Sequence, residues 1–284
     1  MLEFLTTPLQ YPFMVRGMIA AVLVGIVCAV LGCFVILRGM AFLGDALSHA
    51  ILPGVAVGYL VSGGAQGSVF WWAMATALLS ALGIGAVTRS SRIKEDTAIG
   101  IIFSGMYALG IALISTVRNY TADLTHFLFG DVLGVSSADL VRTAIFGALI
   151  LLVIFLFYKE FVVQSFDPVL SATLRLPNRA LEFTLIALVA ITIVVSLQTV
   201  GVALLVALLV TPAATASLLI RRLPGMMAIA TLIAALSGII GLYLSYYLNI
   251  ASGSAIVLTC TVIFLLVWGG QNLAKRLKPA PKIA

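Results

Sequence analysis

The stretch MVRGMIAAVLVGIVCAVLGCFVIL, residues 14–37, contains Arg16 as its one charged side chain. A helix of this kind crosses the hydrocarbon core of a bilayer, about 30 Å thick, for which roughly 20 apolar residues suffice. The rest of the chain is similar, because 62% of its residues are hydrophobic and only 9% are charged. An average soluble domain carries roughly 25% charged residues. The sequence therefore predicts an integral membrane protein without a large soluble domain.

Further apolar runs follow, each bounded by polar or turn-forming residues. We expect spans at 14–37, 41–63, 68–88, 96–117, 140–158, 180–197, 200–220, 225–248 and 253–270. Only SLQTVG, residues 196–201, joins the sixth span to the seventh, which allows either a full hairpin or a re-entrant half-span. The predicted fold is an all-α, polytopic transmembrane helical bundle with eight or nine spans.

The basic residues predict the orientation, because cytoplasmic loops hold an excess of Lys and Arg. With nine spans, every basic residue except Arg16, Arg118 and Arg142 lies on the same side as the C-terminal tail. That side is then cytoplasmic and the N-terminus faces outward, whereas eight spans would reverse the N-terminus. The basic residues are scattered and form no patch with interleaved aromatic residues, so we expect no nucleic-acid partner.

No soluble linker or internal repeat divides the chain. We expect a single transmembrane domain over residues 1–284, with a short N-terminal segment (1–13), a cytoplasmic loop (159–179) and a cytoplasmic tail (271–284). Within that loop, DPVLSATLRLP predicts a short helix with Asp167 as N-cap, Pro168 at its first position and Pro177 as its end. A short helix displayed between two spans is suited to binding a partner protein.

Asp45 and His49 lie four residues apart in RGMAFLGDALSHAILPGV, residues 38–55. An ionisable group at membrane depth costs about 2.5–3.5 kcal/mol on insertion scales, which makes it a candidate functional residue. On a helix both side chains share one face, and their oxygen and nitrogen ligands suit divalent first-row metals. Two copies about a two-fold axis would supply enough ligands for a transient cation site. Pro53 and Gly54 predict a broken or kinked helix at this point.

The alternative interpretation of this pair needs no metal. Asp45 would be the N-cap of a helix that begins near Ala46, and His49 would be satisfied by neighbouring backbone. Other polar positions are weaker candidates. Glu182 is explained by Arg179 three residues earlier, and His126 and Asp131 by solvated positions in an outer loop.

Motifs for catalysis are absent from the sequence. It contains no HExxH, no GxSxG and no phosphate-binding P-loop. We therefore expect a transport subunit and not an enzyme, with ATP hydrolysed on another chain.

Five segments resemble the integral membrane permease subunit of bacterial manganese/zinc ABC importers, in the family's order and over most of the chain. They are RGMAFLGDALSHA, KEDTAIGI, LFGDVLGVS, FDPVLSATLRLP and VGVALLVALLVTPAATA. The resemblance implies a type II importer permease in the bacterial cytoplasmic (inner) membrane, surrounded by lipid and working as a homodimer. It implies two ATP-binding subunits on the cytoplasmic face and an extracytoplasmic metal-binding protein on the other.

The resemblance also implies roles for particular residues. Asp45 and His49 would coordinate the transported cation, Mn²⁺ or Zn²⁺ with Fe²⁺ as a third candidate, and no cofactor would be bound permanently. The segment coupled to the ATPase would contain Phe166, Asp167, Pro168, Leu174, Arg175, Leu176 and Pro177. The family usually has Gly shortly before the Leu-Pro of this segment, where this chain has Arg175.

Two other classes of transporter remain open from the sequence. A permease for metal chelates such as siderophores or cobalamin shares the fold plan, but it has no need for Asp45 and His49 to face each other. A secondary cation transporter usually needs several buried carboxylates, and the predicted spans contain few.

Overall fold

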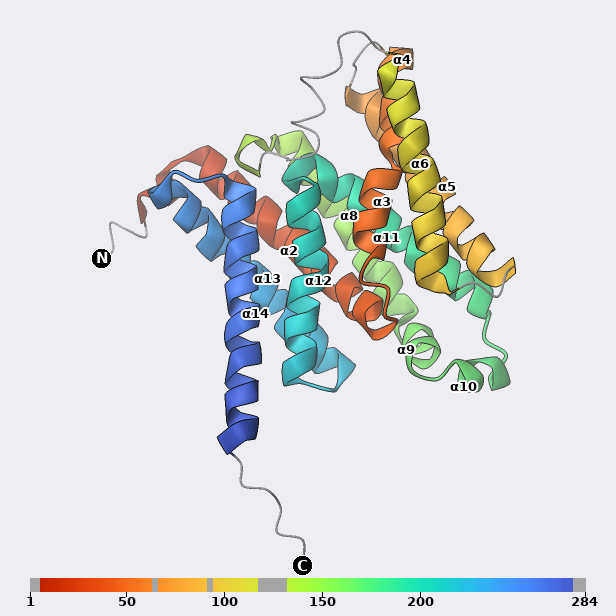
Figure 1. Cartoon of the computed structure of the whole chain (residues 1–284). Helices are drawn as coiled ribbons and strands as arrows, with labels where there is room; N and C mark the ends of the chain where they lie inside the picture. Colours follow the sequence, from red (N-terminus) through yellow and green to blue (C-terminus); the bar gives the residue numbers. More distant parts are fainter. Residues whose placement is uncertain (1–5, 63–65, 91–93, 117–131, 278–284) are drawn as a thin grey trace, which may run out of the picture.

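The structure is a computed structural model that describes residues 6–62, 66–90, 94–116 and 132–277. The regular elements of these residues are all helical, which confirms the predicted all-α bundle (Figure 1). The order is η1 (Pro8–Gln10), α2 (Pro12–Leu37), α3 (Leu43–Ala50), α4 (Leu52–Ser62), α5 (Gln66–Ser90), α6 (Glu95–Ser115), η2 (Val132–Gly134), α8 (Ser137–Leu156), α9 (Tyr158–Phe166), α10 (Pro168–Thr173), α11 (Asn178–Val200), α12 (Val202–Leu219), α13 (Leu223–Leu248) and α14 (Ser252–Leu277).

Nine helical stretches of the described residues are long and apolar enough to cross a membrane, with α3 and α4 counted together as Leu43–Ser62. This is the upper of the two predicted counts. The doubtful pair consists of two separate spans, Asn178–Val200 and Val202–Leu219. Gly201 joins them with φ at 78°, a left-handed value at which glycine carries no steric penalty.

The two ends of the bundle differ in the connections that they carry. In Figure 1, α9, α10, the turn between α12 and α13 and the C-terminal end of α14 all lie at the lower end. The start of α2, the junction between α11 and α12 and the turn between α13 and α14 lie at the upper end. The connections at the lower end are the ones predicted to be cytoplasmic from their basic residues. The two ends therefore agree with the predicted topology, and the orientation itself stays a prediction.

Helix α2 lies in the middle of the bundle and packs against α8, α11, α12 and α13. Small residues let two of these helices approach closely. An added side chain at Gly25 would meet Ala234 of α13 at 3.2 Å, and one at Gly238 would meet Ala21 at the same distance. Small residues at crossings are typical of helix packing in membranes, where close van der Waals contact drives association.

The segment predicted to form a cytoplasmic loop is more helical than the sequence indicated. Helix α8 ends at Leu156, and α9 then occupies the first half of the expected loop. Asp167 is the N-cap of α10, as predicted, because its Oδ1 accepts from the Leu170 amide at 2.9 Å.

The predicted end of this short helix at Pro177 is wrong. α10 stops at Thr173, and Arg175 takes a left-handed φ of 55°. The Arg175 amide donates to the Ala172 carbonyl (3.0 Å) and the Leu176 amide to the Ser171 carbonyl (3.1 Å). This double hydrogen bond is a helix C-cap whose left-handed position favours glycine.

Candidate cation site between α3 and α6

Asp45 lies inside α3 and not at its cap. The helix begins at Leu43, so Asp45 is its third residue, and the N-cap position is Phe42, which makes no side-chain capping bond. The interpretation of Asp45 as an N-cap is therefore wrong. The adjacent Gly44 lies so close to α12 that an added Cβ would meet Leu209 Cδ2 at 2.6 Å. The lack of a side chain at Gly44 therefore lets the start of α3 lie close to Leu209.

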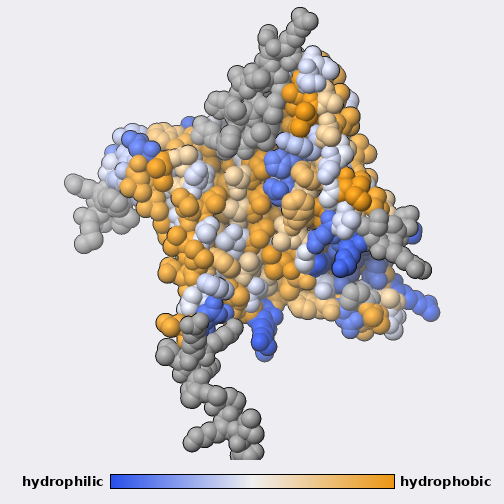
Figure 2. Space-filling model, viewed as in Figure 1, coloured by the Kyte–Doolittle hydropathy of each residue, from blue (hydrophilic) through white to orange (hydrophobic). Residues whose placement is uncertain are grey.

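The Asp45 and His49 side chains point to one side of α3, as their spacing predicts. His49 Nε2 lies 3.7 Å from Asp45 Oδ1, and the two side chains are 29% and 40% exposed, respectively. Two bonds of about 2.1 Å, typical of nitrogen and oxygen ligands on Zn²⁺, span up to about 4.2 Å. One ion can therefore bridge the two atoms. Figure 2 shows a hydrophilic patch over α3 within a hydrophobic surface.

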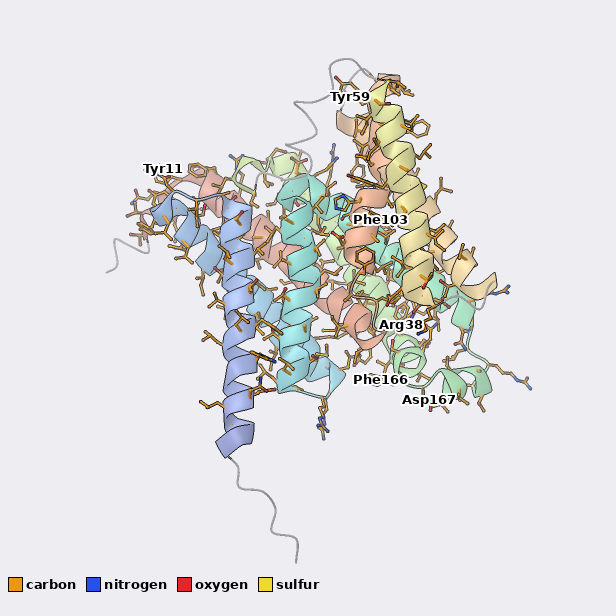
Figure 3. The ribbon with its side chains drawn as sticks, viewed as in Figure 1. Tyr11, Arg38, Tyr59, Phe103, Phe166 and Asp167 are labelled. Carbon is orange, nitrogen blue, oxygen red and sulfur yellow. The ribbon has the colours of Figure 1, made fainter. Side chains whose placement is uncertain are left out.

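Aromatic side chains from α6 form one wall beside the pair. The His49 ring lies 5.7 Å from that of Tyr107, edge to face, and 6.1 Å from that of Phe103. Phe103 and Tyr107 stack at 5.8 Å, and Phe42 meets Phe103 edge-on at 5.9 Å. Figure 3 labels Phe103 on the side of α6 that faces α3. We call Phe42, Phe103 and Tyr107 the aromatic wall.

The aromatic wall could not be predicted from the sequence. Phe103 and Tyr107 are four residues apart, the same spacing as Asp45 and His49, but α6 is apolar around its whole circumference. An apolar helix gives no signal of which face meets another helix.

A break in the helix follows the pair directly. Ile51 separates α3 from α4, as Pro53 and Gly54 predict. Pro53 has no N–H to donate to the carbonyl of His49 four residues earlier, and its ring would clash with that carbonyl. The break therefore begins two residues after His49. Beyond it, an added Cβ at Gly54 would collide with Thr76 and the backbone of Trp72 on α5.

One chain contributes two candidate ligand side chains to the pair, those of Asp45 and His49. Among residues 6–62, 66–90, 94–116 and 132–277, no group of three or more His, Cys, Asp or Glu side chains is placed to hold a metal ion. Glu182 lies in the second turn of α11, at the end predicted to be cytoplasmic, and is an electrostatic neighbour of Arg38. His126 and Asp131 lie outside the described residues.

The residues assigned to ATPase coupling lie together at the lower edge of the molecule, where Figure 3 labels Phe166 and Asp167. Phe166 is 55% exposed, and Val169 of α10 is 77% exposed. Leu174 and Arg175 are also exposed, whereas Leu176 packs partly against the core. Pro168 is the first residue of α10 and Pro177 the N-cap residue of α11. Exposed apolar side chains at a membrane protein's aqueous end suit a protein partner.

Comparison with known proteins agrees with this architecture. Residues 10–270 match the model of the ABC 3 transport family. The manganese transport system membrane protein MntC of Listeria innocua serovar 6a is 49% identical over 266 residues, which are 93% of this chain and 93% of that protein. A probable iron transport system membrane protein of Haemophilus influenzae is 38% identical over 266 residues, 94% of this chain and 96% of that protein.

A solved structure is similar over nearly the whole length. PsaBC from Streptococcus pneumoniae, in complex with Fab, has a chain that is 41% identical, with a TM-score of 0.81 and coverage of 94% of both chains. The nine candidate spans agree with a family of membrane transport proteins. This chain belongs to the ABC 3 transport family and is a multi-pass membrane permease subunit of an ABC transporter, whose ATP hydrolysis takes place on a separate subunit.

Proposed function

We propose that this chain is the permease of an ATP-driven importer for divalent first-row metal ions, with Mn²⁺ as its principal substrate. The partly exposed Asp45/His49 pair is the observation that carries the proposal, since its ligand types suit such ions and its 3.7 Å separation suits one ion. The identity to MntC supports manganese over zinc. Fe²⁺ is the second candidate because of the iron-transport relative.

Two copies complete the site in this proposal. One copy supplies a carboxylate and an imidazole, and a second copy about a two-fold axis supplies the same pair from the opposite side. The partial exposure of both side chains leaves them accessible to a partner copy. The expected assembly contains this homodimer, two ATP-binding subunits at α9–α10 and an extracytoplasmic metal-binding protein. It lies in the bacterial cytoplasmic membrane.

In the proposed transport cycle, a weak cation site lies between an outer gate and a cytoplasmic gate. ATP binding draws the cytoplasmic ends of the permease together, and the outer face opens to the loaded binding protein. The cation passes to the carboxylates and imidazoles of the paired Asp45 and His49, and hydrolysis resets the gates. The site holds the ion only weakly, because transport requires release as well as capture.

The test is Mn²⁺ uptake by proteoliposomes that contain the permease, its ATPase and its binding protein. Asp45→Ala and His49→Ala each remove a direct ligand, so we expect uptake to fall at least about tenfold, since even outer-shell changes cost 10–100-fold at metal sites. Asp139→Ala is the matched control, because that carboxylate lies in the capping box at the start of α8. It should leave uptake near the wild-type rate.

Three results would contradict the proposal. Mn²⁺ uptake that survives both alanine variants would remove the pair from the route. Uptake of a metal chelate in place of the free ion would favour a chelate permease. Uptake that continues without the ATPase subunits would favour a secondary transporter.

A further inference from the structure

The cytoplasmic ends of four helices meet around Arg38, a residue outside the candidate cation site. Arg38 caps α2, and Gly39 follows it with φ at 72°. The Gly39 amide donates to the Ile36 carbonyl (3.1 Å), and the Met40 amide donates to the Val35 carbonyl (3.0 Å). This glycine C-cap places the Arg38 cation at the negative end of the helix dipole.

The guanidinium of Arg38 faces three other helices. Its Nε donates to Ser165 Oγ of α9 at 3.4 Å. The charges of Glu95, the first residue of α6, and of Glu182 of α11 act on Arg38 electrostatically. Burial lowers the pKa of Arg38, and the two carboxylates oppose that shift. Within the part of the chain that the structure describes, its Nη2 is buried and has no hydrogen-bond partner.

Helices α9 and α10, the segment expected to dock onto the ATPase, contact α2 and α11 directly. Phe161 of α9 packs on Phe34 of α2 with ring centroids 5.8 Å apart, and both side chains are fully buried. Gln164 of α9 donates to the Asn178 carbonyl at the start of α11 (2.9 Å). The Ser171 hydroxyl of α10 donates to the side-chain oxygen of Asn178. A displacement of α9–α10 is therefore passed to α2 and α11.

We call Arg38, Ser165, Glu95 and Glu182 the Arg38 cluster. Helix α6 connects this cluster with the candidate cation site. It begins at Glu95 and carries Phe103 and Tyr107, which contact His49. Figure 3 shows Arg38 between Phe103 on one side and Phe166 on the other. Figure 2 shows hydrophilic surface over the lower end of α6. Because a helix moves largely as a rigid element, a shift at Glu95 moves the aromatic wall.

We propose that Arg38 is a positioning residue that couples α9–α10 to the aromatic wall, by holding Ser165 and the acidic start of α6 in one cluster. The inference rests on the proposed function, because it requires a cation at Asp45 and His49. Removal of the Arg38 charge would then uncouple hydrolysis from transport. The cation ligands and the exposed docking side chains would both remain.

The test measures Mn²⁺ uptake and ATP hydrolysis together, in proteoliposomes of the complete transporter. We expect Arg38→Ala to lower the Mn²⁺ imported per ATP about tenfold, within the range typical of coupling between sites, with hydrolysis near the wild-type rate. Arg38→Lys keeps the charge and should restore part of the ratio. Glu95→Gln keeps the side-chain shape and should lower the ratio in the same direction. Arg221→Ala, at an exposed arginine in the α12–α13 turn, is the matched control and should change nothing.

Two outcomes would overturn the inference. One is an unchanged ratio of Mn²⁺ to ATP in both Arg38→Ala and Glu95→Gln. The other is a parallel loss of uptake, hydrolysis and thermal stability that Arg38→Lys does not reverse, which would indicate a purely structural role. If Arg38→Ala does not fold, Glu95→Gln decides. A failure of the proposed function can be distinguished from a failure of this inference. The former would appear as absent Mn²⁺ uptake in the wild type, or as unchanged uptake in Asp45→Ala.

Discussion

Arg175 has an unfavourable backbone conformation at the end of the short helix α10. Its left-handed φ of 55° is unfavourable for an L-residue by roughly 1–2 kcal/mol, whereas glycine adopts it freely. We expect Arg175→Gly to stabilise the turn after α10 by about 1 kcal/mol, measured as slower hydrogen exchange of the amides that form the C-cap. Arg175→Ala removes the same charge but keeps a Cβ, so it should show no such gain. Equal exchange in the two variants would mean that backbone strain at this position is negligible.

Among the helices, the important feature is the break between α3 and α4, which begins two residues after His49. Pro53 removes a backbone hydrogen bond to His49, and the glycine-lined contact of α4 with α5 holds the broken geometry. Pro53→Ala would restore the missing donor and straighten the span, so we expect equal or higher thermal stability but lower Mn²⁺ uptake, because His49 turns away from the aromatic wall. Pro224→Ala is the control, since a proline in the first turn of α13 replaces no intrahelical bond. Wild-type uptake in Pro53→Ala would show that the break has no part in transport.

At the scale of the whole molecule, the candidate cation site is open on one side. Only 17% of the α6 span is buried within the chain, and this helix lies beside the half-exposed Asp45/His49 pair. If a second copy covers this side, Ser104→Cys, at an exposed position of α6, should form a cross-link between two copies in membranes. Leu265→Cys on the exposed face of α14 should not. The native cysteines are buried and give little background. Cross-links from α14 in place of α6 would place the two-fold axis elsewhere.

The sequence by itself determined the features that depend on neighbouring residues. The membrane spans follow from unbroken apolar runs, because unsatisfied backbone groups force each run into a helix. The common direction of Asp45 and His49 follows from helical spacing. The cap at Asp167 and the break near Pro53 follow from local hydrogen bonding and from the missing proline N–H.

Only the tertiary structure decided which distant residues meet. The aromatic wall joins residues of α3 and α6, and the Arg38 cluster joins residues of α2, α6, α9 and α11. Helix α9 and the left-handed Arg175 were not expected from their sequence, since neither carries a strong local signal. The physical reason is that the sequence of a span that is apolar on every side does not indicate which face is buried. Close packing of small residues and a few buried polar contacts then select the neighbours.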